Sequence, residues 1–180
     1  MIFSRRTLLS LGAGAALVGG MGASPAEAAL RMRLERSIYL YNPHTGEFLR
    51  TVYWQDGHYQ PTALRQVNRI LRDHYSGDVH SMEPRVIDLL SVIQHKFGVQ
   101  KPIHVISGYR SPKTNAFLRR HSDGVAAHSL HMEGKAVDIR IEGASIEHLG
   151  RAARSLRLGG VGQYPASGFV HVDVGRVRTW

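Results

Sequence analysis

The sequence predicts an α+β domain in which helices flank a small antiparallel sheet. Three observations lead to this fold class: a hairpin pattern early in the chain, amphipathic helices after it, and short β-branched strands toward the end. The chain has 180 residues, of which 43% are hydrophobic. That length supplies one hydrophobic core and is short for two domains.

The first predicted elements are a β-hairpin and two helices. Residues 37–41 and 47–54 have strand-like composition and enclose an Asn-Pro-His-Thr-Gly turn. Apolar residues recur at helical spacing through residues 60–75. A second helix is predicted from the proline that opens residues 84–97 to the glycine at position 98.

The second half of the chain is predicted to alternate short strands with short helices. Strands are expected at residues 102–107, 135–141 and 169–174, which are apolar and β-branched. Ser111 and Ser145 are helix N-caps, so helices are expected to follow each of them, the first through Arg120 and the second up to the Gly-Gly pair at 159–160.

Residues 1–28 have the pattern of an export signal. Arg5 and Arg6 precede a weakly apolar run at residues 8–18, and Ala-Glu-Ala at 26–28 is a small-x-small cleavage site. The paired arginines resemble the twin-arginine signal, although a general secretory signal remains an alternative. We therefore expect a mature domain of residues 29–180 in the periplasm or cell envelope, with no membrane span after the signal is removed.

Composition limits the partners and the metal chemistry. The formal net charge of +9 favours an anionic partner such as a cell-wall polymer. No basic helix or nucleic-acid motif is present in the sequence, so we expect no nucleic-acid partner. The chain has no cysteine, so a metal site must use histidine and carboxylate ligands.

One candidate metal site emerges from strand alternation. In the predicted strand 135–141, Asp138 points away from the apolar face, and Gly134 allows the preceding His131 to fold back toward it. In the last strand, His171 lies on the polar face. If the two strands are neighbours, two histidines and one carboxylate meet with a fourth position open, as in a catalytic zinc site. The spacing alone is not diagnostic, because a histidine on a polar strand face is usually just exposed.

Three motifs together resemble a known family. They are Ser-x-His-x-x-Gly-x-Ala-x-Asp at 129–138 with His-Val-Asp at 171–173, Ile-Ser-Gly-Tyr-Arg-Ser at 106–111, and Gly-Gly-Val-Gly-x-Tyr-Pro at 159–165. In this order they resemble the M15 zinc peptidases, a group with a fold shared by D-Ala-D-Ala peptidases and hedgehog-like proteins, and most closely its murein endopeptidase K branch. The resemblance covers nearly the whole mature chain.

This resemblance implies an activity and roles for individual residues. It implies a monomeric, Zn²⁺-dependent endopeptidase that hydrolyses peptide cross-links of peptidoglycan, of the 4-3 or the 3-3 type. His131, Asp138 and His171 would be the zinc ligands, and Arg110 would polarise the substrate carbonyl in the cleft. Two alternatives stay open: a D-Ala-D-Ala carboxypeptidase or dipeptidase, and a non-catalytic wall-binding module with structural zinc.

The general base is absent from its usual place. Several M15 members carry an acid or a histidine a few residues before the last zinc ligand, but here those positions hold Gly168 and Phe169. Asp173 shares the strand face of His171, so it is the first candidate for the base, with orientation of His171 as an equal alternative. Weaker candidates are His121, His128 and Glu133. Ser129 is expected to orient a ligand or substrate.

Overall fold

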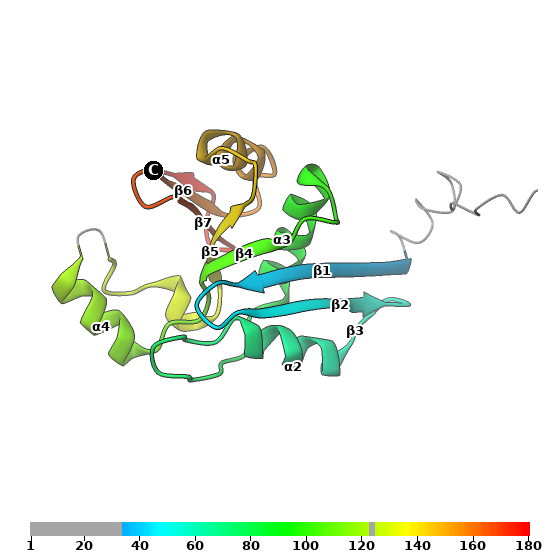
Figure 1. The fold of residues 1–180 in the computed structure, drawn as a ribbon, viewed down its shortest axis with the longest axis horizontal. Coiled ribbons are helices and arrows are strands. Elements are labelled where there is room, and N and C mark those ends of the chain that lie inside the picture. The colour runs from blue at the N-terminus through cyan, green and yellow to red at the C-terminus, as the bar shows by residue number, and fades with distance from the viewer. Residues whose placement is uncertain (1–33, 123–124) are drawn as a thin grey trace, which may run out of the picture.

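The computed structural model describes residues 34–122 and 125–180 (Figure 1). The predicted export signal lies outside these residues, so its type and its cleavage site remain predictions. Among the helices of the described ranges, none combines the length and the apolar character that crossing a membrane requires.

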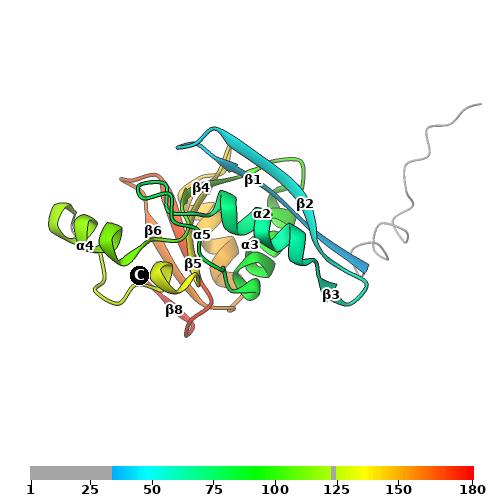
Figure 2. The ribbon, with the colours of Figure 1, turned by 90° about the horizontal axis from the view of Figure 1, so that it is seen from below.

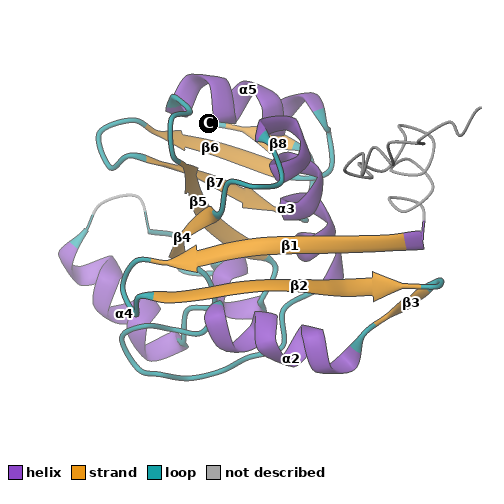
Figure 3. Cartoon of the chain, turned by 45° about the vertical axis from the view of Figure 1, so that its right-hand side comes forward, coloured by secondary structure: helices purple, strands orange, loops and turns teal. Residues whose placement is uncertain are grey.

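A single eight-stranded sheet runs through the molecule in the order β3-β2-β1-β4-β5-β7-β6-β8 (Figure 3). The strands are β1 (Glu35–Asn42), β2 (Glu47–Gln55), β3 (His58–Tyr59), β4 (Ile103–Ser107), β5 (Ala136–Ile141), β6 (Gly160–Tyr164), β7 (Phe169–Asp173) and β8 (Arg178–Thr179). The α+β class is confirmed, but the sheet is mixed rather than purely antiparallel. The reason is that β1 runs parallel to β4 and β8 runs parallel to β6.

Four α-helices and one 3₁₀ helix complete the described fold. They are α2 (Pro61–Ile70), α3 (Pro84–Phe97), α4 (Pro112–His121), α5 (Ile146–Ser155) and η1 (Leu130–Glu133). Helix α2 ends earlier than its apolar pattern predicts. The side chain of Asn42 donates to the carbonyl of Ile70, and the amide of Tyr109 donates to the carbonyl of Leu71. These carbonyls at the end of the helix are therefore satisfied by tertiary contacts rather than by a further helical turn.

The hydrophobic core lies between the sheet and the helices. Helix α3 packs on β1 and β5, α5 packs on β6 and β7, and α2 packs on β2 (Figure 2). Val137 and Ile139 of β5 and Val170 and Val172 of β7 are fully buried in this core. Because side chains alternate along a strand, the residues between them project from the opposite face of the sheet.

Strand β6 is the longest strand that the sequence pattern missed, and the two-residue strands β3 and β8 were missed as well. The Gly-Gly pair at 159–160 was predicted only as a helix end, yet the segment pairs with β7 on one side and β8 on the other. Glycine weakens a strand, so its presence here indicates a close approach of other groups. Those groups prove to be side chains of the candidate site.

Candidate metal centre

The sheet register brings two predicted ligands together. Asp138 of β5 pairs directly with His171 of β7, on the face opposite the core. The Asp138 Oδ1 atom lies 2.8 Å from His171 Nδ1, and only 5% of the Asp138 surface is exposed. The alternation of apolar and polar residues in two strands therefore predicted this pair correctly.

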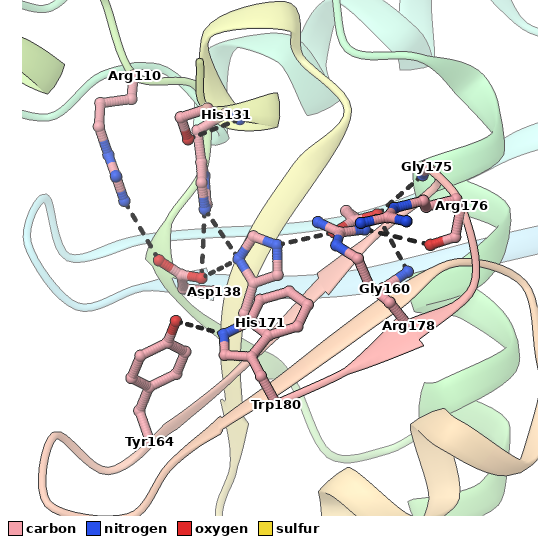
Figure 4. Close-up of polar contacts among 12 residues, drawn as sticks. Arg110, His131, Asp138, Gly160, Tyr164, His171, Gly175, Arg176, Arg178 and Trp180 are labelled. Carbon is pink, nitrogen blue, oxygen red and sulfur yellow. Dashed lines mark hydrogen bonds and ion pairs between the residues drawn. The ribbon is translucent and has the colours of Figure 1, made fainter. Parts of the chain in front are cut away.

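His131 reaches the same point from helix η1 (Figure 4). Gly134 ends η1 in the left-handed conformation, with φ of 66°, which is the bend that the sequence predicted. The imidazole Nε2 of His131 lies 3.2 Å from His171 Nδ1 and 3.3 Å from Asp138 Oδ1. All three ligand atoms lie within 4.8 Å of one another.

Backbone contacts orient His131. Its Nδ1 lies 2.7 Å from the carbonyl oxygen of Gly108, so Nδ1–H donates to that oxygen. In return, the amide of Arg110 donates to the carbonyl of His131 over 3.2 Å. Nε2 is then left unprotonated in the neutral imidazole, and its lone pair faces the other two ligands.

His171 is oriented by a buried carboxylate instead. Its Nε2 lies 3.1 Å from Oδ2 of Asp173, whose residue surface is fully buried. Asp173 also accepts from both terminal nitrogens of Arg178 and from the amides of Gly160 and Gly175. Nε2–H of His171 therefore donates to Asp173, which directs Nδ1 toward Asp138 and His131.

The protonation of this cluster follows from its charges. Burial acts to raise the pKa of Asp138, but the charges and hydrogen bonds of His131 and His171 outweigh burial and hold that pKa well below its usual range. Burial likewise acts against ionisation of Asp173, but His171, Arg178 and backbone donors lower its pKa. The pKa of His171 is raised, because its two carboxylate partners outweigh burial.

The donor set fits a divalent metal ion. With both outer imidazole nitrogens donating elsewhere, two nitrogen lone pairs and one carboxylate oxygen converge on one point, where they repel each other unless a metal ion or a proton on His171 lies between them. Four ligands at about 2.0–2.1 Å in a tetrahedron lie about 3.3 Å apart. The observed separations of 2.8, 3.2 and 3.3 Å are close to that edge.

The remaining predicted site residues lie at different distances from this point. Arg110 is half-buried beside the cluster, where Nη2 donates to Asp138 Oδ2 over 3.3 Å and to Ser107. Its Nε is buried and has no hydrogen-bond partner among the described residues. Asp173 lies beneath His171, and its oxygens are already occupied by donors, a placement that favours orientation of His171 over proton transfer with water.

The weaker base candidates are not gathered at the cluster. Glu133 is exposed and pairs with Lys135. His121 is exposed on α4, where its ring contacts the carbonyl of Phe117. His128 is exposed on the wall of the cleft, and Ser129 caps η1 by accepting from the amide of His131. Of these four residues, Ser129 alone contacts a predicted ligand.

Sequence reasoning missed three residues around His171, namely Tyr164, Arg178 and Trp180. Arg178 and Trp180 fold over β6, where a Cβ at Gly160 would collide with the Arg178 side chain and a Cβ at Gly162 would lie 2.5 Å from the Trp180 ring. The glycines of the Gly-Gly-Val-Gly motif are therefore needed for this close approach. That motif was the signal in the sequence, but it does not say which side chains fill the space.

The cluster lies in an open cleft of about 550 Å³. Its walls include Arg110, His131, Asp138 and His171 together with aromatic side chains such as Tyr164 and Trp180. A polar cluster that can hold a metal, placed in a cleft of this size beside a half-buried guanidinium, has the features of a catalytic site.

Comparison with known proteins gives consistent matches. The family profile described as peptidoglycan L,D-endopeptidase MepK, within the M15 peptidases, matches residues 31–180. The peptidoglycan L,D-endopeptidase MepK of Escherichia coli K12 is 41% identical over 177 residues, which cover 98% of this chain and 97% of the relative. A protein of Haemophilus influenzae named as a probable peptidoglycan L,D-endopeptidase MepK is 40% identical over 178 residues, covering 98% and 95%.

One solved structure also shows a partial likeness. The L-Ala D-Glu endopeptidase ChiX of Serratia marcescens superposes with a TM-score of 0.36 and 17% identity, over 53% of this chain and 69% of that one. A likeness of this extent bears neither on the fold nor on the function.

Proposed function

The chain belongs to the peptidoglycan L,D-endopeptidase MepK family of M15 peptidases, and from this premise we propose that it is a zinc-dependent endopeptidase of the peptidoglycan layer. Membership of a peptidase family makes the chain an enzyme of that class. The observation that carries the proposal is the convergence of the His131, Asp138 and His171 ligand atoms in an open cleft. The substrate class comes from the names of the relatives.

We propose that the enzyme cuts an amide bond that joins two peptide stems. An L,D-endopeptidase hydrolyses an amide whose acyl side comes from an L-configured centre and whose amine side comes from a D-configured centre. Among the cross-links considered from the sequence, this stereochemistry favours the 3-3 type over the 4-3 type. An open cleft suits an internal bond, because both stems must extend beyond the point of cleavage.

Zinc is the metal that we propose for the site. Two imidazole nitrogens, one carboxylate oxygen and an open fourth position are the donors that catalytic zinc uses. A bound zinc ion would supply an acidified water and would polarise the amide carbonyl. The chain's own part is to hold the three donors, with Gly108 fixing the tautomer of His131 and Asp173 fixing that of His171.

Arg110 and Asp173 receive different roles in this proposal. The guanidinium of Arg110 lines the cleft and lies 3.3 Å from Asp138, which supports a role in stabilising the negative charge that develops on the carbonyl oxygen. Asp173 is proposed as the residue that orients His171, rather than as the base, because its oxygens already accept from His171, Arg178 and two amides.

The place of action follows from the proposed substrate. Peptidoglycan lies outside the cytoplasm, so we propose that residues 1–28 direct export, by the twin-arginine route, and that residues 29–180 work as a monomeric domain in the periplasm. The basic composition of the chain is compatible with an anionic wall polymer.

Digestion of purified cross-linked peptidoglycan tests the proposal. We expect the zinc-loaded protein to convert cross-linked dimers to monomers, and we expect a chelator to stop the reaction. His131→Ala should lose both zinc and activity, since the pKa of water returns from about 7 to about 15.7 without the metal. His95→Ala, at an exposed position on α3, is the matched control and should keep both.

Other results would overturn parts of the proposal. Intact dimers with trimmed D-Ala ends would indicate a carboxypeptidase. Intact dimers with tight binding to the sacculus would indicate a wall-binding module. A His131→Ala protein that keeps its zinc would refute the ligand set.

A further inference from the structure

Tyr164 projects toward the cleft from the same sheet face as His171. In the β6–β7 ladder, Gly162 pairs with His171 and Tyr164 pairs with Phe169. Residues two apart in a strand share a face, so Tyr164 is the diagonal neighbour of His171. Its ring stacks on Phe169 with centroids 4.6 Å apart, and both rings line the cleft.

Trp180 lies between Tyr164 and His171. Its amide donates to the carbonyl of Val161, and its carbonyl accepts from the amide of Gln163. The indole ring lies over Gly162, with its centroid 5.3 Å from the centroid of the His171 ring. The guanidinium of Arg178 lies 4.7 Å from the same ring. The indole is therefore contacted by the backbone at Gly162 and by the His171 and Arg178 side chains, while 50% of the Trp180 surface stays exposed.

The hydrogen bond between the two side chains has a defined direction. Indole Nε1–H can only donate, and it lies 2.7 Å from the Tyr164 hydroxyl oxygen, so that oxygen is the acceptor (Figure 4). The phenolic proton must then point elsewhere. Within residues 34–122 and 125–180, no acceptor is found for it. Accepting one hydrogen bond also makes a hydroxyl a stronger donor.

We propose that the Tyr164 hydroxyl donates a hydrogen bond to the carbonyl oxygen of the amide being cut, with Trp180 as its positioning residue. This inference rests on the proposed function. When water forms the new C–O bond it gives up a proton and the carbonyl π electrons move to oxygen; they return as the C–N bond breaks, and the leaving nitrogen takes up the proton that the water lost. Arg110 and Tyr164 lie on opposite sides of Asp138 (Figure 4), so the oxygen is stabilised from two directions.

Tyr164→Phe tests the donor while keeping the stacked ring. We expect kcat on a cross-linked muropeptide dimer to fall on the order of 100-fold, with KM changed by less than about threefold, because the bond is strongest when the oxygen carries charge. Zinc content and thermal unfolding should stay at wild-type levels. Tyr41→Phe, in β1 and outside the cleft, is the control and should behave as wild type.

A binding measurement distinguishes hydrogen-bond donation by Tyr164 from a role in packing alone. A phosphinate analogue, with tetrahedral phosphorus in place of the scissile carbon, should bind Tyr164→Phe more weakly by about the factor lost in kcat/KM. Trp180→Phe keeps a ring but removes the indole donor, so we expect a loss of about 10-fold or less. A kcat within threefold of wild type for Tyr164→Phe, or a rise in KM alone, would overturn the inference. Failure of the wild-type protein to cut dimers would overturn the proposed function instead.

Discussion

Two regions of the molecule supply the candidate metal centre, and they hold their side chains by different means. Strands β5 and β7 supply Asp138 and His171, whose separation is fixed by the ladder between the strands. The segment between β4 and β5 supplies Arg110 from a loop and His131 from the short helix η1. The strand region is held by register and by an ion pair whose carboxylate, Asp173, is buried, whereas His131 in the connecting segment is oriented by one hydrogen bond to a backbone carbonyl.

The difference shows where each region is vulnerable. In the strand region, a ligand moves only if the ladder slips or its buried support is lost. In the connecting segment, Gly108 approaches Leu71 so closely that a Cβ would collide with its carbonyl oxygen, and Gly134 needs a left-handed conformation. We therefore expect changes to the buried support of the strand region to have the largest effects, and changes in the connecting segment to have smaller ones.

The largest expected effect comes from Asp173→Asn, which removes the buried charge behind His171. The side-chain amide that replaces the carboxylate accepts Nε2–H of His171 less strongly, and it leaves Arg178 without a negatively charged partner. We expect zinc affinity to fall on the order of 100-fold, and the free energy of unfolding to fall by about 3 kcal/mol. Competition with a metal indicator and urea unfolding measure the two effects. Asp56→Asn, at an exposed turn, is the control; unchanged affinity in Asp173→Asn would show that His171 needs no carboxylate support.

Gly134→Ala disturbs the backbone bend that ends η1 in the connecting segment. A Cβ there would lie 2.5 Å from the carbonyl oxygen of Ser81, in addition to the strain of a positive φ. We expect a loss of about 2 to 3 kcal/mol in unfolding free energy and weaker zinc binding, because η1 carries His131. Gly57→Ala has a positive φ but nothing near its Cβ, so it should lose only about 1 kcal/mol. Equal losses for the two variants would mean that the contact with Ser81 relaxes without moving η1.

The difference between the strand region and the connecting segment also explains what could be predicted from the sequence. Alternation along β5 and β7 predicted that Asp138 and His171 share a face, and the register confirms it. Strand β6 was missed because three of the four residues at 159–162 are glycine, a residue that is depleted in strands, although its hairpin partner β7 follows after a short turn. The end of α2 was predicted too late, because the contact between Leu71 and Tyr109 is tertiary. Local pattern therefore predicted that Asp138 and His171 share a face, whereas the end of α2 is decided by a contact between distant segments.

The smallest effect is expected on acidification and concerns Asp73, which anchors the start of α4 beside Arg110. Its carboxylate accepts from the amides of Ser111 and Tyr75, each over 2.9 Å. Burial acts against ionisation, but hydrogen bonds from Thr114, Ser111 and Tyr75 outweigh it and lower the pKa of Asp73 from 3.8 to about 2. A lowered pKa gives stability that is present above the unfolded-state pKa and is lost as pH falls toward the folded-state pKa.

Comparison of wild type with Asp73→Asn isolates this contribution, because Asp138 and Asp173 titrate in both proteins. The variant has no carboxylate to titrate at this position, so the stability advantage of wild type should shrink by about 2 kcal/mol between about pH 5 and pH 2. Urea unfolding of the metal-free proteins across that range measures the difference. An advantage that does not change with pH would show that α4 and the Arg110 loop are held by contacts other than this carboxylate, which would make the connecting segment less dependent on single hydrogen bonds than its geometry indicates.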